Sequence, residues 1–205
     1  MGYDTENNDQ RFTNAGFTIY KGKTMNINFE APYGDLAKEI HQFNVDKGWW
    51  DDYLDDKTKR LDLAYMLVVS ELSEAMEGCR KDLMDDKLPH RKMFDVELAD
   101  AVIRLLDMAG AYGVGLDALE ILGTEPMENI PSSKPVQLWQ IVKGLGVRSE
   151  ESDSLAITGA MYMILQVCSY NNIDLRQIMK EKMEYNATRA DHLRENRVKA
   201  GGKKF

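Results

Sequence analysis

The sequence predicts an all-α protein, a helical bundle with a short β-hairpin arm at its N-terminus. From Asp35 onward, apolar side chains recur at the three-to-four-residue spacing of amphipathic helices. Glycine and proline residues interrupt this pattern where helices commonly end. Only a segment near the N-terminus instead alternates apolar and polar residues, as a strand does. We therefore expect an arm over residues 1–34 and one helical domain over residues 35–205.

The expected arm contains a hairpin signal over residues 17–29. Apolar and polar residues alternate on both sides of a connection that contains Gly22, and a glycine-containing connection is typical of a hairpin. Residues 1–16 are polar and are expected to attach loosely. Because two short strands are marginally stable alone, we expect the hairpin to lean on the helical body or on a second subunit.

Seven helices are expected after the arm. Asp35 is a candidate N-cap for the first helix, and Gly48 follows it where a terminating glycine belongs. Pro126 and Pro131 predict a loop over residues 123–133. The expected helices span residues 35–47, 58–79, 91–112, 117–122, 135–145, 154–170 and 174–190.

Composition narrows the function classes. A chain of 205 residues with 43% apolar residues can bury a core of its own. Its net charge of −8 argues against a general nucleic-acid binder, which needs a basic face to displace counterions. An acidic protein can still bind a polyphosphate if metal ions and local cations neutralise it. The two cysteines, Cys79 and Cys168, form no disulfide framework and indicate reducing conditions.

The opening residues and the longest apolar run do not lead us to expect a signal peptide or a membrane span. The opening residues, MGYDTENNDQRF, lack the apolar segment of a signal peptide. The longest near-apolar run, residues 155–168, is too short to span a bilayer. We therefore expect a cytoplasmic protein that does not associate with membranes.

Two acidic pairs with identical spacing are the strongest chemical signal in the chain. Glu71 and Glu74 lie three residues apart, as do Glu97 and Asp100, so each pair projects from one face of its helix. Four carboxylates at the edge of an apolar core repel one another. Mg²⁺ prefers oxygen ligands of this kind and keeps sites for water and phosphate. The pattern predicts a metal site shared by two antiparallel helices; the alternative is a solvated acidic face.

The last predicted helix carries groups suited to phosphate. Lys182, Asn186 and Arg189 follow one another at i, i+4 and i+7, on one helix face. Lysine supplies a point charge and arginine a planar fork, and both suit phosphate oxygens. The alternative is a solvated basic face that the helix dipole favours. Arg104 continues the Glu97–Asp100 face, either as a salt-bridge partner or as a cation directed at phosphate.

Aromatic residues after the first helix could hold a flat ligand. Trp49 and Trp50 follow the helix that contains His41. A tryptophan there can serve as a core anchor or as a plate for a nucleobase, since base–aromatic stacking contributes about 1–3 kcal/mol.

Together these blocks resemble the all-α nucleoside triphosphate pyrophosphatases, the MazG-like group that also includes the dimeric deoxyuridine and deoxycytidine triphosphate enzymes. The family signature, Glu-x-x-Glu followed by Glu-x-x-Asp, matches Glu71-Leu-Ser-Glu74 and Glu97-Leu-Ala-Asp100. The segment IHQFNVDKGWWDD resembles the family's N-terminal helix, and KMEYNATR with GGKK resembles the C-terminal ending of viral and bacterial members. The resemblance covers about residues 35–112 and 174–205.

The resemblance implies hydrolysis of a nucleoside triphosphate to the monophosphate and pyrophosphate, with Mg²⁺ as cofactor and Mn²⁺ as a substitute. It makes Glu71, Glu74, Glu97 and Asp100 the metal ligands, with Glu74 as a candidate to orient the attacking water. The base pocket would use His41 and Trp50, with Trp49 as a possible substitute. Lys182 and Arg189 would hold the distal phosphates, and Asn186 a phosphate or the sugar.

The chain departs from the compact family pattern at residues 118–173, which we interpret as an inserted helical hairpin. Some viral members act on deoxyguanosine triphosphate, so a preference for dGTP, in the host cytoplasm if the protein is viral, is an expectation from the resemblance. Apolar character around most of the 58–79 helix predicts a homodimer or a homotetramer built as a dimer of dimers. Two rival functions stay open: a different metal-dependent phosphohydrolase, and a non-catalytic helical assembly protein.

Overall fold

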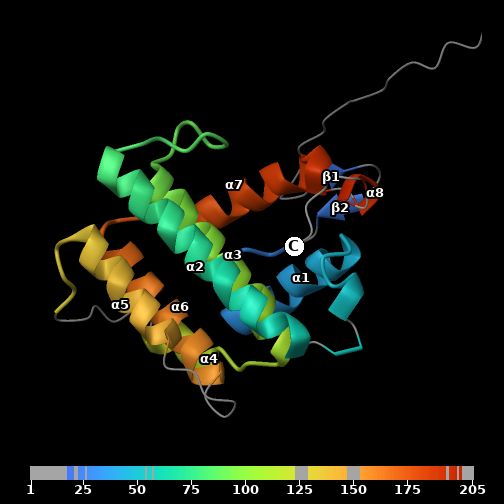
Figure 1. Ribbon diagram of the computed structural model, residues 1–205, viewed down its shortest axis with the longest axis horizontal. Coiled ribbons are helices and arrows are strands. Elements are labelled where there is room, and N and C mark those ends of the chain that lie inside the picture. Colours follow the sequence, from blue (N-terminus) through green and yellow to red (C-terminus); the bar gives the residue numbers. More distant parts are fainter. Residues whose placement is uncertain are drawn as a thin grey trace, which may run out of the picture.

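The computed structural model describes residues 18–20, 23–25, 27–53, 55–56, 58–122, 129–146, 153–192, 194–197 and 199. Helices dominate this part of the chain, so the all-α class is confirmed (Figure 1). The α-helices are α1 (Tyr33–Asp46), α2 (Thr58–Lys81), α3 (Met93–Tyr112), α4 (Asp117–Leu122), α5 (Lys134–Gly146), α6 (Asp153–Tyr170), α7 (Leu175–Thr188) and α8 (Arg194–Arg197). The described residues also form two short 3₁₀ helices, η1 (Asp51–Tyr53) and η2 (Ala190–His192).

The seven predicted helices are all present, and their ends fall within two residues of the predicted bounds. Gly48 follows α1 with φ 77, the left-handed conformation that a glycine adopts without strain. Asp174 caps α7 by accepting a hydrogen bond from the Gln177 amide at 3.2 Å. The predicted N-cap of α1 was wrong: the helix begins after Pro32, and Asp35 lies in its first turn.

Two short strands lie where the sequence indicates a hairpin. β1 (Thr18–Tyr20) pairs with β2 (Lys23–Met25) in antiparallel register, with Ile19 opposite Thr24. β1 contacts α7, which belongs to the helical body. Residues 1–17 of the predicted arm and residues 123–128 of the predicted loop lie outside the described residues. The N-terminal arm over residues 1–34 therefore stays a prediction.

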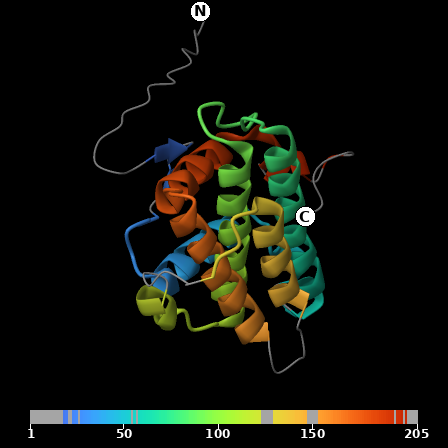
Figure 2. The same cartoon turned by 90° about the vertical axis from the view of Figure 1, so that its left-hand side faces the viewer.

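Helix α3 forms the centre of the bundle, and α1, α2, α6 and α7 all contact it. In Figure 1, α2 and α3 run side by side in opposite directions, with α1 on one side and the α5–α6 pair on the other. The quarter-turned view in Figure 2 again shows α5 and α6 next to each other. Most of α3 is buried, including Leu98, Val102 and Leu105, as expected for a helix that is apolar around most of its circumference.

A close crossing brings α1 onto α3. A Cβ atom added at Gly110 would lie 2.4 Å from the Ala37 carbonyl oxygen and 2.6 Å from the His41 Cβ atom. The absence of a side chain at Gly110 therefore permits the two backbones to approach, and this approach fixes where His41 lies. The segment for which an insertion was inferred forms α4, α5 and α6, and α5 and α6 pack on each other and on α2 and α3.

None of the helices that the structure describes combines the length and the apolar character needed to cross a membrane.

Candidate metal and anion site

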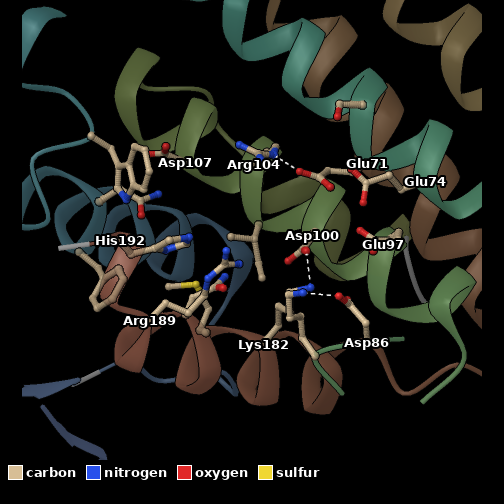
Figure 3. A pocket seen from close by; sticks show the side chains of 18 of the residues that line it. Glu71, Glu74, Asp86, Glu97, Asp100, Arg104, Asp107, Lys182, Arg189 and His192 are labelled. Carbon is tan, nitrogen blue, oxygen red and sulfur yellow. Dashed lines mark hydrogen bonds and ion pairs between the residues drawn. The ribbon is translucent and has the colours of Figure 1, made fainter. Parts of the chain in front are cut away.

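The two acidic pairs meet between α2 and α3. One carboxylate oxygen each from Glu71, Glu97 and Asp100 can be chosen so that all three lie within 4.8 Å of one another. Glu71 and Glu97 are buried, and the Asp100 side chain is 16% exposed. Figure 3 shows these side chains converging from the two helices. The i, i+3 spacing places both acids of α3 on the face that meets α2, which is what the sequence predicted.

Glu74 belongs to the same acidic cluster but lies nearer to solvent. Its side chain is exposed at the cavity described below, beside Glu71 and Glu97 in Figure 3. Partial desolvation, followed by the neighbouring charge of Glu71, raises the pKa of Glu74 above its ordinary value. Its accessibility distinguishes it from the three more buried carboxylates.

Burial and like charge disturb the ionisation of the two acids on α3. Desolvation, then the neighbouring Asp100, raises the pKa of Glu97 to about 9. Desolvation likewise raises the pKa of Asp100 to about 6, although Lys182 opposes the shift. In the absence of a cation, Glu97 is therefore protonated at neutral pH. A divalent cation would favour the charged form of both groups.

Two basic side chains already bind carboxylates of this cluster. The Lys182 Nζ atom lies 2.8 Å from the Asp100 Oδ2 atom, and Arg104 Nε donates to Glu71 Oε1 at 2.5 Å. Lys182 is only 5% exposed, whereas the Arg104 side chain is 37% exposed. The structure thus brings Lys182 of α7 to Asp100 of α3, and Arg104 of α3 to Glu71 of α2.

An ion pair holds α7 in the position that places Lys182 at the acids. Arg91, in the connection between α2 and α3, binds Glu181 through two hydrogen bonds of 3.0 and 2.7 Å. Hydrogen bonds from Arg91 hold the pKa of Glu181 down at about 2, so this carboxylate stays charged across the physiological range. Lys182, the next residue of α7, reaches Asp100 with its Nζ atom.

A cavity of about 340 Å³ extends from the acidic cluster between α2, α3 and α7. At one end it is lined by the four acids, Arg104 and Lys182. Its remaining lining includes Asn186 and Arg189, the two further groups predicted on α7. The Asn186 Oδ1 atom is buried and has no hydrogen-bond partner among the described residues, so it can accept a hydrogen bond from a ligand.

The other end of the cavity is aromatic. Trp49 and His192 line it, with their rings edge to face and their centroids 5.3 Å apart. The Arg197 guanidinium lies 3.7 Å from the centroid of the Trp49 ring and donates to the Gly48 carbonyl at 2.8 Å. The end of the chain therefore helps to hold the Trp49 side chain in place.

His41 and Trp50 do not line this cavity. The Trp50 ring is completely buried, and its Nε1–H group donates to both carboxylate oxygens of Asp107 at 3.1 and 3.2 Å. His41 Nδ1 contacts the same Asp107 at 2.8 Å, and the Arg60 guanidinium lies 4.6 Å from the Trp50 ring centroid. Of these residues, Asp107 and Arg60 line the cavity, whereas Trp50 is the core anchor that the sequence left as an alternative.

Several cavity residues were missed by sequence reasoning. Asp107 lies seven residues after Asp100 on the same face of α3, and this spacing was a usable signal. Arg60 lies in the first turn of α2 and donates from Nη1 to the Trp49 carbonyl at 2.7 Å, which no local pattern indicates. Lys87 and Asp86 come from the connection between α2 and α3 and pair with each other.

Comparison with known proteins gives no relative for this chain. No family model matches it, and neither the curated proteins nor the solved structures contain a significant match.

The donor set suits a hard divalent cation. The converging carboxylates supply only oxygen ligands, and their spacing allows them to share one ion. The raised pKa values of Glu97 and Asp100 mark an unmet need for positive charge. The adjoining cavity provides cations at its acidic end and aromatic rings at the other. Such an arrangement can bind an anion beside a metal ion and a flat ring farther away.

Proposed function

We propose that the protein is a Mg²⁺-dependent nucleoside triphosphate pyrophosphohydrolase of the MazG-like type, which converts a (d)NTP into the monophosphate and pyrophosphate. The observation that carries this proposal is the convergence of Glu71, Glu97 and Asp100 beside Lys182 and Arg104 at one end of a single cavity. Carboxylates with adjacent cations are what a metal-bound polyphosphate needs.

In this proposal the three more buried acids hold the metal ion, and the exposed Glu74 acts on the attacking water. Glu71, Glu97 and Asp100 would be the ligands of Mg²⁺, or of Mn²⁺ in its place. The ion would supply charge neutralisation and a more acidic bound water. Glu74, at the cavity surface, would complete the ligand set or accept the proton of the attacking water.

The rest of the cavity would bind the substrate. Lys182, Arg104 and Arg189 would hold phosphate oxygens, and Asn186 would accept a hydrogen bond through its unpartnered oxygen. Trp49 takes the role of base plate first assigned to Trp50, because Trp49 lines the cavity and Trp50 is buried. His41 would act on the substrate only through Asp107 and Trp50.

The experiment is a substrate screen with product identification. The protein is incubated with Mg²⁺ and each of the four ribo- and four deoxyribonucleoside triphosphates, starting with dGTP, and the products are separated by ion-exchange chromatography. We expect monophosphate and pyrophosphate in equal amounts. Glu97→Gln is the matched control, because the substitution removes one proposed ligand oxygen charge while keeping the side-chain volume.

The same screen tests the rival functions. Release of orthophosphate would indicate a different metal-dependent phosphohydrolase. No turnover of any triphosphate, with equal behaviour of wild type and Glu97→Gln, would favour a non-catalytic helical protein with an acidic face.

A further inference from the structure

The two ion pairs at the acidic cluster involve two of the carboxylates that a metal ion would need. Lys182 Nζ binds Asp100 Oδ2, and Arg104 Nε binds Glu71 Oε1. Asp100 and Glu71 are also two of the three acids whose oxygens converge within 4.8 Å. A divalent ion at this point would therefore share carboxylates with an ammonium and a guanidinium group that carry the same sign of charge.

Because a divalent ion and the two basic side chains are all positively charged, they compete for the same carboxylates. Without a metal ion, Lys182 and Arg104 partly neutralise the crowded carboxylates, and Lys182 does so almost fully buried. When a divalent ion is added, each basic group is repelled by the ion, and its carboxylate partner is drawn toward the ion. A buried ammonium that loses its partner is costly unless another anion replaces it.

We infer that Lys182 and Arg104 are internal counter-ions, which a divalent cation displaces from Asp100 and Glu71 and which then bind the anionic part of the ligand. This inference rests on the proposed metal site. Both side chains line the cavity, so an anion inside it can take over the pairing that the carboxylates give up. Asp86, which lies beside Lys182 in Figure 3, is exposed and is itself paired with Lys87.

The exchange makes metal and polyanion binding mutually dependent. Because the metal ion releases the cations that the anion needs, the metal should tighten anion binding, and the anion should tighten metal binding by the same factor. It also gives Lys182 opposite effects on its two ligands: in the absence of an anion it opposes the metal ion, and in the presence of the metal ion it favours the anion.

The test measures Mn²⁺ binding by electron paramagnetic resonance, without nucleotide and without turnover. We expect Lys182→Met to bind Mn²⁺ at least about tenfold more tightly than wild type, which corresponds to about 1.4 kcal/mol. The matched control is Lys87→Met, the same substitution at a residue that lines the same cavity but pairs with Asp86. It should change Mn²⁺ affinity by less than about threefold, since the partner of Lys87 is the exposed Asp86 and an ion pair at the surface contributes little.

A second titration follows inorganic tripolyphosphate binding by calorimetry in saturating Mn²⁺. Lys182→Met should weaken this binding at least about tenfold, a change of about 1.4 kcal/mol opposite in sign to its effect on the metal. Arg104→Met, at a position more exposed than that of Lys182, should show the same pair of opposite effects. Arg104→Met also provides the test if Lys182→Met does not fold.

The outcomes separate this inference from the proposed function. If Lys182→Met and Arg104→Met both bind Mn²⁺ more weakly than wild type, the two basic residues help to hold the acids in place when the metal ion is bound. The inferred displacement is then wrong, although the metal site stands. The inference is also overturned if Lys182→Met and Arg104→Met bind Mn²⁺ and tripolyphosphate with the same affinities as Lys87→Met. If wild type binds no Mn²⁺, the proposed metal site itself fails.

Discussion

The ionisation of Glu97 depends strongly on the fold. It lies 4% exposed beside Asp100, and desolvation followed by that neighbouring charge raises its pKa from an ordinary 4.5 to about 9. The native state therefore holds a proton that the unfolded chain releases at moderately acidic pH. This difference makes the stability of the metal-free protein depend on pH.

We predict that the metal-free protein loses stability as the pH rises from 5 to 9. Between the unfolded and folded pKa values of Glu97, the native state binds one more proton, so the free energy of unfolding falls by at most about 1.4 kcal/mol per pH unit for this group. Urea unfolding in EDTA, measured across this range, checks the slope.

Glu97→Gln is the control for this pH dependence, because glutamine cannot release the proton. Its stability should change less with pH than that of wild type, and Mg²⁺ should stabilise wild type most strongly at the alkaline end. A wild-type protein whose stability is constant from pH 5 to 9 would contradict the placement of Glu97 in a desolvated acidic cluster.

Trp49 and Trp50 are adjacent in sequence and differ completely in environment. Trp50 is buried and donates to Asp107, whereas Trp49 is half-buried and lines the cavity. We predict that Trp50→Phe lowers the free energy of unfolding by about 1–3 kcal/mol, because Asp107 loses a buried donor. Trp49→Ala should instead weaken nucleotide binding by about 1–3 kcal/mol through lost stacking.

The two tryptophan variants are measured by urea unfolding and by calorimetric titration with a nucleoside triphosphate in Mg²⁺. Each serves as the control for the other, since one should affect mainly stability and the other mainly binding. If Trp50→Phe leaves stability unchanged while it abolishes binding, the base would contact Trp50, as first expected from the resemblance.

At the scale of the elements, the site depends on how closely α1 crosses α3. Gly110 has no Cβ atom where the Ala37 carbonyl oxygen and His41 approach it. By contrast, Gly159 on α6 has open space at the position of an added Cβ atom. Substitution by alanine should therefore have opposite effects on stability at these two glycines.

We predict that Gly110→Ala destabilises the protein by about 1–3 kcal/mol, because the added methyl group forces the two helices apart. Gly159→Ala should stabilise it by about 0.5–1 kcal/mol, since alanine favours a helix over glycine and meets no neighbour there. Denaturant titrations of both variants measure the difference. Equal effects in the two variants would show that the close α1–α3 crossing does not constrain the fold.

At the scale of the whole molecule, large apolar side chains remain on the surface. Met66 on α2 is 61% exposed, Trp139 on α5 is 58% exposed and Leu155 on α6 is 75% exposed. Apolar surface of this kind is typical of contacts between subunits when it forms a continuous patch. The predicted homodimer or homotetramer therefore stays a prediction for the intact protein.

Light scattering on the purified protein checks the assembly, and we expect the mass of a dimer or tetramer. A mixture of the inactive chains Glu74→Gln and Arg189→Ala checks whether subunits share a site. Recovered activity would mean that one subunit supplies the acids and its neighbour supplies α7. In the structure, Lys182 of α7 already binds Asp100 of the same chain, so a dimer without recovered activity would place each site within one subunit.

The sequence alone determined the features that depend on neighbours along the chain. Apolar periodicity located the helices to within two residues, because burial of one face repeats with the helix period. The spacing of the acids at i, i+3 determined that each pair projects together. The meeting of the two acidic pairs between neighbouring helices could also be inferred, since consecutive helices joined by a short connection pack antiparallel.

Only the tertiary structure decided the contacts between residues far apart in sequence. Nothing near Lys182 indicates that it binds Asp100, and nothing near Trp50 indicates that Asp107 takes its N–H group. The choice of Trp49 as the cavity residue likewise depends on how the segment after α1 turns over α2 and α3. Periodicity specifies which face of a helix is buried, whereas the partner of that face is specified by the packing of the whole bundle.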